Sequence, residues 1–169
     1  MNLIDPFIQE FEMETANTRK VLERVPEDKF SYKPHEKSYT MCELASHIAN
    51  SLEWTRETVD KDVFEMDPEQ YKPFIAESNA DLLETFDKNV AMAKEKLATC
   101  SNESLLTMWQ MKVGGKVALE MPRMAVLRFF ILNHMIHHRG QLDVYLRMND
   151  VPLPQVYGPT ADEPGMMGG

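Results

Sequence analysis

The last third of the chain contains a long helical pattern between Pro122 and Met148. Along it, apolar side chains and two histidines recur at alternating three- and four-residue spacings, which is the period of one helix face. At roughly 1.5 Å per residue, such a helix would span about 40 Å. The predicted inward stripe consists of Met124, Leu127, Ile131, His134, His138, Leu142 and Tyr145.

Three earlier segments carry the same helical period. They cover about residues 5–24, 40–58 and 79–97, and the second begins with the capping-box pattern Thr40-Met41-Cys42-Glu43. Ser78 to Asp81 is a similar start signal for the third. Together with the last helix, these segments predict an all-α, up-and-down four-helix bundle, with residues 1–169 forming a single domain.

The connecting segments predict less regular structure. Apolar residues alternate on both sides of Gly114-Gly115, which predicts a small β-hairpin before the last helix. The stretch that holds Pro68 and Pro73 is expected to be irregular. The tail after Asn149 contains four prolines and cannot be a helix, so we expect it to lie extended on the bundle with Gly168 and Gly169 frayed.

Composition excludes several classes of protein. Eighteen Lys and Arg against 27 Asp and Glu give a net charge of −9, which disfavours binding to a nucleic acid. The chain has no apolar run of membrane-spanning length, and its N-terminus does not resemble a secretory signal. Two cysteines do not form a disulfide framework. We therefore expect a cytoplasmic protein that binds neither nucleic acid nor membrane.

His134 and His138 are the most informative residues for function. Residues four apart on a helix stack on one face, so both imidazoles can reach one divalent transition metal ion. His47 lies on the predicted inward face of the second helix and is the natural third ligand. Three histidines would leave an open position for water or substrate, as in catalytic zinc sites.

An alternative reading is that His134 and His138 are core histidines bonded to carboxylates or to Tyr or Ser groups. From spacing alone, metal binding and this structural role are about equally probable. His137 lies one residue off the stripe and is expected to pack elsewhere, and His35 lies in a loop.

Other reactive residues give weaker signals. Cys42 lies at a helix start, where the helix dipole could lower its pKa, although a buried inert thiol is the favoured reading. Asp5 and Asp162-Glu163 are expected to be solvated acids. Gly114-Gly115 is a turn and not a phosphate-binding loop, because no Lys-Ser/Thr follows it. No residue can be named as a general base.

The histidine-rich segment also resembles a known signature. Residues 133–142, 144–147, 151–154 and 157–163 resemble the last third of the DinB-like (DinB/YfiT) superfamily, and 32–34, 43–47 and Trp54 resemble its second-helix region. The resemblance implies a four-helix bundle with a metal ion bound by three histidines, which map onto His47, His134 and His138. It implies nickel or zinc as the ion, and homodimers are common in such proteins.

The resemblance leaves the activity open. Some similar proteins are metal-dependent transferases that conjugate low-molecular-weight thiols such as bacillithiol to electrophiles, and others are suspected hydrolases or have no assigned activity. We therefore expect a metal-dependent thiol transferase or hydrolase with a small-molecule substrate. The alternative is a non-catalytic metal-binding stress-response protein. The activity of the mycothiol-dependent isomerases is not expected, because nothing in this sequence resembles their extra C-terminal domain.

Overall fold

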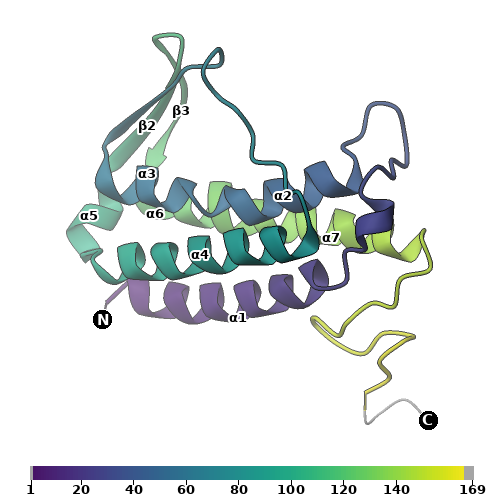
Figure 1. Ribbon diagram of the computed structural model, residues 1–169. Coiled ribbons are helices and arrows are strands. Elements are labelled where there is room, and N and C mark those ends of the chain that lie inside the picture. Colours follow the sequence, from purple (N-terminus) through teal and green to yellow (C-terminus); the bar gives the residue numbers. More distant parts are fainter. Residues whose placement is uncertain (1, 166–169) are drawn as a thin grey trace.

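The structure is a computed structural model that describes residues 2–165, and its fold is mostly helical with a small three-stranded sheet (Figure 1). The predicted fraying of Gly168 and Gly169 lies outside the described residues. In chain order the elements are α1 (Ile4–Leu22), η1 (Glu27–Lys29), α2 (Met41–Ser51), α3 (Trp54–Asp60), β1 (Val63–Met66), α4 (Asn79–Ala98), α5 (Asn102–Leu106), β2 (Met108–Val113), β3 (Lys116–Pro122), α6 (Arg123–Val126), η2 (Leu127–Asn133) and α7 (His134–Arg147).

Two helices begin where their capping residues predict. At the start of α2, the Thr40 hydroxyl accepts from the Glu43 amide at 3.1 Å, and the Glu43 carboxylate accepts from the Thr40 amide at 2.7 Å. At the start of α4, the Ser78 hydroxyl accepts from the amide of Asp81. Each such cap stabilises its helix by about 1 kcal/mol because it satisfies N–H groups that have no partner within the helix.

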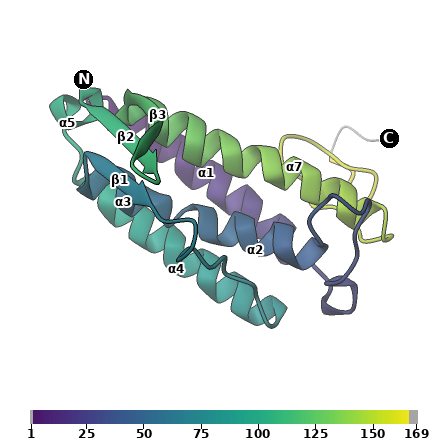
Figure 2. The ribbon, with the colours of Figure 1, turned by 90° about the horizontal axis from the view of Figure 1, so that it is seen from above.

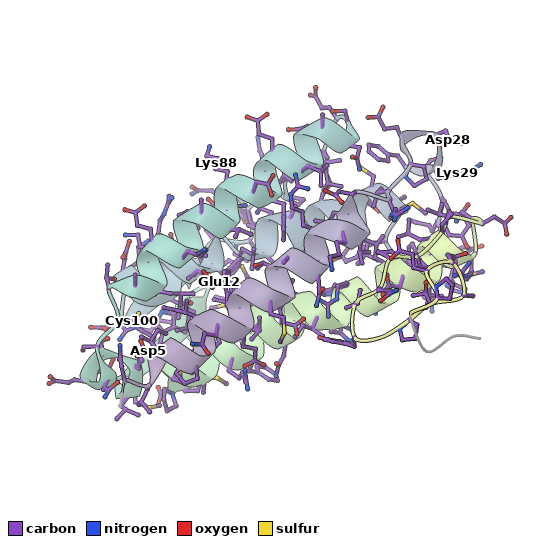
Figure 3. All side chains as sticks on the ribbon, turned by 90° about the horizontal axis from the view of Figure 1, so that it is seen from below. Asp5, Glu12, Asp28, Lys29, Lys88 and Cys100 are labelled. Atoms are coloured by element: carbon purple, nitrogen blue, oxygen red, sulfur yellow. The ribbon has the colours of Figure 1, made fainter. Side chains whose placement is uncertain are left out.

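The four long helices α1, α2, α4 and α7 lie side by side around one apolar core (Figures 1 and 2). The core takes Phe11 from α1, Ile48 from α2, Phe86 from α4 and Leu142 from α7, each 1% exposed or less. Charged side chains such as Lys88 of α4 project away from the helices (Figure 3). Among residues 2–165, no helix combines the length and the apolar character needed to cross a membrane.

The predicted all-α bundle describes this molecule only in part. The predicted second helix is divided at Leu52 and Glu53 into α2 and α3, and the expected irregular stretch after it contains strand β1. The predicted hairpin is present as β2 and β3, but β1 pairs with β2 in parallel, so the sheet is mixed. The sequence did not predict β1 because its four residues gain their hydrogen bonds from a strand more than forty positions away.

Gly114 and Gly115 form the tip of the hairpin with φ of +55° and +77°. Both angles lie in the left-handed region that a two-residue hairpin turn requires and that glycine adopts at little cost. The register of β2 and β3 shifts between Met111 and Lys112.

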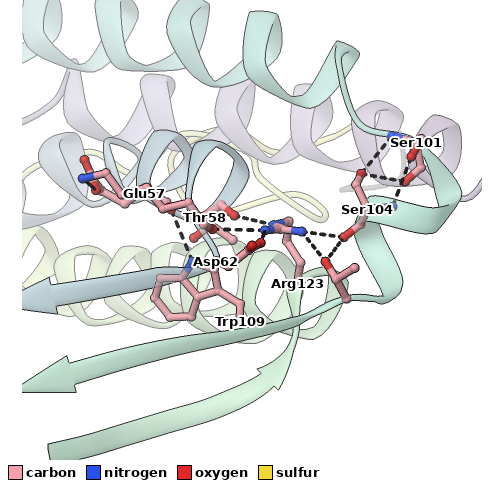
Figure 4. Close-up of polar contacts among 9 residues, drawn as sticks. Glu57, Thr58, Asp62, Ser101, Ser104, Trp109 and Arg123 are labelled. Carbon is pink, nitrogen blue, oxygen red and sulfur yellow. Dashed lines mark hydrogen bonds and ion pairs between the residues drawn. The ribbon is translucent and has the colours of Figure 1, made fainter.

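Arg123 fastens the sheet to the helices (Figure 4). Its buried guanidinium donates to the carbonyls of Thr58, Lys61 and Ser104 at 2.6 to 3.0 Å and to the carboxylate of Asp62. These carbonyls belong to the ends of α3 and α5, where a helix has no internal donors to offer. One arginine therefore fixes how three elements meet at the sheet end of the molecule.

The last helical segment is not a uniform α-helix. Its middle part, η2, is a π-helix, and α7 then buries Met135, Arg139, Leu142 and Leu146 in the core. The predicted stripe is thus correct for Leu127, Ile131, Leu142 and Tyr145, which are buried, but His134 and His138 lie at its edge and are half-buried. Each histidine precedes a core residue by one position, which is about 100° around a helix.

The C-terminal segment lies on the helices through ion pairs, as an extended tail without helix. Asp162 pairs with Arg147 and accepts from the amide of Leu153, and Glu163 pairs with Arg24. The prediction that Asp162 and Glu163 are merely solvated was wrong, because the fold brings Arg147 at the end of α7 and Arg24 just after α1 next to them.

A buried ion pair joins α1 to α7 beneath this tail. Arg139 and Glu14 are 2% and 3% exposed, and their charged atoms lie 2.8 Å apart. The hydroxyl of Tyr157 completes the cluster by donating to Glu14 at 2.7 Å and by accepting from Arg139 at 2.6 Å. Such a pair holds its helices in one register, because neither charge can be left alone in the core.

We therefore expect Glu14→Ala to lower the free energy of unfolding by about 3–5 kcal/mol, because it leaves the Arg139 charge buried without its carboxylate. Glu10→Ala is the matched control, since Glu10 on the same helix pairs with the half-exposed Arg128 at the surface. It should cost less than about 1 kcal/mol. Urea denaturation of both variants checks the difference, and equal losses would contradict it.

Candidate metal centre

The structure brings together all three histidines that the sequence singled out. His47 comes from α2, and His134 and His138 come from successive turns of α7. The Nε2 atom of His134 lies 3.4 Å from Nε2 of His47 and 2.9 Å from Nε2 of His138. One ligand atom from each ring falls within 4.8 Å of the others, so this cluster could hold a metal ion.

Neighbouring side chains fix the orientation of the three rings. Gln141 Oε1 lies 2.7 Å from Nδ1 of His138 and accepts its N–H, so the neutral ring keeps an unprotonated Nε2 toward the cluster. The ring of Phe130 stacks on His134 at 5.8 Å between centroids, and the ring of Tyr39 lies 6.0 Å from that of His47. The role of Gln141 was not predicted from the sequence, although its i+3 position from His138 could have indicated it.

Burial keeps these imidazoles uncharged at neutral pH. Desolvation lowers the pKa of His134 to about 4, and repulsion by His138 and His47 acts in the same direction. Desolvation also lowers the pKa of His47, followed by the effect of His138. The pKa of His138 falls for the same reason, although its bond to Gln141 opposes the shift. Neutral imidazoles offer the lone pairs that a metal ion requires.

The geometry is compatible with a bound ion, although the 2.9 Å separation of the Nε2 atoms of His134 and His138 is also that of a hydrogen bond. Two nitrogens about 2.0–2.1 Å from one tetrahedral ion lie about 3.4 Å apart, the separation of Nε2 in His47 and His134. Among residues 2–165, no hydrogen bond joins these three rings to a carboxylate, a Tyr hydroxyl or a Ser hydroxyl. One ligand nitrogen from each of three half-buried rings therefore lies in one cluster, and an ion could bind all three.

The other candidates take no part in the cluster. His137 is exposed on α7, with its ring 5.0 Å from that of His138. His35 is exposed and accepts from the Lys37 amide. Burial raises the pKa of the Cys42 thiol, so the favoured reading of an inert thiol agrees with the structure.

Cavities of different character lie against the three histidines. Two adjoining cavities of about 340 and 180 Å³ share His47, Ser51, Trp54 and Tyr71 as lining residues, and together they are called the aromatic hollow here. A third cavity of about 210 Å³ is lined by His138 and shares Tyr39 with the aromatic hollow. It is called the polar hollow, and its lining includes Lys37, Ser38, Tyr39, Gln141 and Tyr145.

The lowered pKa of His134 predicts how the metal-free protein responds to acid. Its pKa is about 4 when folded and 6.5 ordinarily, so below pH 6.5 the unfolded chain binds more protons. The free energy of unfolding should therefore fall as the pH drops from 6.5 toward 4, and the fall should be smaller in His134→Gln. Urea denaturation in a chelator at several pH values measures this difference. Identical pH dependence in the two proteins would contradict it.

Comparison with known proteins identifies relatives over most of the chain. The DinB family model matches residues 1–166. The Bacillus subtilis protein YrdA, which is described as uncharacterised, is 22% identical over 165 residues, covering 95% of this chain and 91% of YrdA. The uncharacterised B. subtilis protein YjoA is 28% identical over 142 residues, covering 81% of this chain and 85% of YjoA.

Solved structures share the fold. A DinB-like protein from Bacillus cereus superposes with a TM-score of 0.69 at 24% identity, covering 89% of this chain and 95% of that one. The crystal structure of B. subtilis YjoA gives a TM-score of 0.68 at 25% identity, covering 90% of this chain and 98% of YjoA. The family match over residues 1–166 shows that the chain belongs to the DinB family, whose fold these structures share with it.

Proposed function

We propose that His47, His134 and His138 bind one divalent transition metal ion, nickel or zinc, and that the protein is a metal-dependent enzyme that transfers a small thiol to an electrophilic carbon. The observation that carries this proposal is the convergence of three Nε2 atoms with no fourth protein ligand among residues 2–165. Structural zinc sites are closed by four protein ligands, whereas catalytic sites keep one position for water or substrate.

The residues around the cluster support a chemical role. When bound, such an ion would act as a Lewis acid that lowers the pKa of a coordinated thiol or water. Gln141 would hold His138 in the tautomer that presents Nε2. Phe130 and Trp54 would keep water away from one side of the site, because their rings pack edge to face at 5.2 Å and Phe130 covers His134.

The two kinds of hollow support a reaction between two unlike substrates. The polar hollow next to His138 offers the Lys37 ammonium, the Ser38 hydroxyl and the Gln141 amide, which suit the charged and polar groups of a low-molecular-weight thiol. The aromatic hollow lies on the side of His47 and His134 and offers mainly apolar surface for the second substrate.

The proposed thiol transfer needs only the thiol and the electrophile as reactants. The thiol sulfur forms a bond to the electrophilic carbon, the leaving group departs with the electrons of its bond to that carbon, and the thiol proton passes to solvent. Hydrolysis is the second reaction that an open site of this kind can support, but it is helped by a free general base. The carboxylate lining these hollows, Glu43, is engaged by the Thr40 amide, and this bond lowers its pKa. This observation favours thiol transfer over hydrolysis.

The metal site can be tested by titration. We expect protein purified without nickel resin and stripped with a chelator to bind one zinc or nickel ion per chain in calorimetry. His138→Ala should weaken binding by at least about 100-fold, and Gln141→Leu by about 10- to 100-fold, because Gln141 only orients a ligand. His137→Ala is the matched control and should bind like the wild type. If the metal-free protein binds no ion, or if His137→Ala loses as much affinity as His138→Ala, the assignment is wrong.

The reaction can be tested with thiols and a model electrophile. We expect the metal-loaded protein to conjugate bacillithiol, glutathione or coenzyme A to a chromogenic aryl halide, with the product identified by mass spectrometry. The rate should fall to the uncatalysed level in His138→Ala and remain in His137→Ala. An ester substrate assayed in parallel distinguishes hydrolysis. If metal is bound and no thiol is transferred, the transferase proposal fails and the site is non-catalytic or hydrolytic.

A further inference from the structure

The aromatic hollow is bounded by two well-defined walls. One wall is the face of α2 on which Glu43, His47, Asn50 and Ser51 follow one another at helical spacing. The facing wall belongs to the segment between β1 and α4, which crosses over α2 (Figure 2). This segment contributes Tyr71 and Phe74 to the lining.

The crossing segment is fixed in place at its end. The amide of Ala76 donates to the buried hydroxyl of Ser46 at 2.9 Å, and the thiol of Cys42 donates to the Ala76 carbonyl at 3.4 Å. Both partners lie on α2, so the wall that carries Tyr71 and Phe74 is tied to the helix that carries His47. The hollow is therefore preformed between the two walls, as ligand-binding cavities usually are.

Aromatic rings continue from this hollow to the metal centre. The ring of Trp54 lies 5.0 Å from Phe64 and 5.2 Å from Phe130, both edge to face, and Phe130 in turn stacks on His134. Trp54 also lines both cavities of the hollow. A planar group that enters beside Trp54 would thus contact aromatic surface while its reactive end lies near the histidines.

The charges around the hollow restrict what can enter. Among the described residues, Glu43 is the only Asp, Glu, Lys or Arg in the lining of the two cavities. The whole chain carries a net charge of −9. At the same time Tyr39, Tyr71 and Ile75 expose 52%, 46% and 47% of their surface in this one place. Apolar surface without a cation suits an apolar ligand and disfavours an anionic one.

We propose that the aromatic hollow binds the apolar aromatic part of the electrophilic substrate in an uncharged form, with Trp54 and Tyr71 as specificity-determining residues. This assignment rests on the proposed function for the identity of the reaction, but the binding itself requires neither metal nor turnover. The larger cavity, at about 340 Å³, is within the size range of small-molecule sites. An aromatic group there would bury the ring faces that are now exposed at the mouth.

Binding of a matched pair of probes tests the proposal. Neutral naphthylmethanol should bind the chelator-treated protein in NMR titrations, whereas naphthalenesulfonate, which has the same rings and a negative charge, should bind at least about tenfold more weakly. Tyr71→Ala and Trp54→Ala should each weaken naphthylmethanol binding by about tenfold. Tyr71→Ala is the primary variant, because the exposed position of Tyr71 leaves the fold intact, which circular dichroism checks.

Phe129→Ala is the control, since Phe129 is an exposed aromatic on η2 that does not line the hollow. The proposal is overturned if naphthylmethanol does not bind, if the sulfonate binds as tightly, or if Phe129→Ala weakens binding as much as Tyr71→Ala. Selective probe binding without thiol transfer would leave this inference standing while the proposed function fails. Thiol transfer without probe binding would support the proposed function and overturn this inference.

Discussion

The packing of α2 against α7 is the constraint on which the rest of the structure depends. Leu44 and Ile48 on α2 and Met135 and Leu142 on α7 are buried almost completely, and they set the separation of the two helices. The three histidines lie at the edge of this contact, where each is half-buried. The core thus holds the rings at a separation that suits a metal ion, although the ion would have no contact with the centre of the core.

The position at the edge explains the chemistry of the site. In the middle of the core, an ion could not exchange ligands with solvent, and at the surface the histidines would become protonated in weak acid. Half-burial lowers the pKa of His134 to about 4, while one cavity still reaches the cluster at His134 and another at His138. The fully buried polar residue of α7 is instead Arg139, whose charge is neutralised by Glu14. The helix therefore carries a structural ion pair in its buried part and the candidate metal ligands His134 and His138 at its half-buried edge.

The sheet and the crossing segment supply side chains that line the aromatic hollow next to the histidines. Arg123 anchors the sheet by binding carbonyls at the ends of α3 and α5, and the sheet contributes Met66 and Met111 to the cavity that Trp54 and Phe130 also line. Ser46 ties the following segment to α2. These contacts form the aromatic hollow beside His47 and His134, whereas the polar hollow beside His138 is lined by the loop before α2, by Leu44 of α2 and by α7.

The sequence by itself determined the features that depend on residues close together in the chain, namely the helices and their caps. Helical spacing and the caps at Thr40 and Ser78 predicted the long helices, and the His134–His138 spacing with His47 predicted which rings converge. Only the tertiary structure decided the break between α2 and α3, strand β1, the π-helical segment and the partners of Arg139 and Asp162. The hollows also belong to this second group. Strand β1, the Arg139–Glu14 pair and the hollows depend on groups tens of residues apart, and their hydrogen bonds, ion pairs and desolvation arise only when the chain has folded.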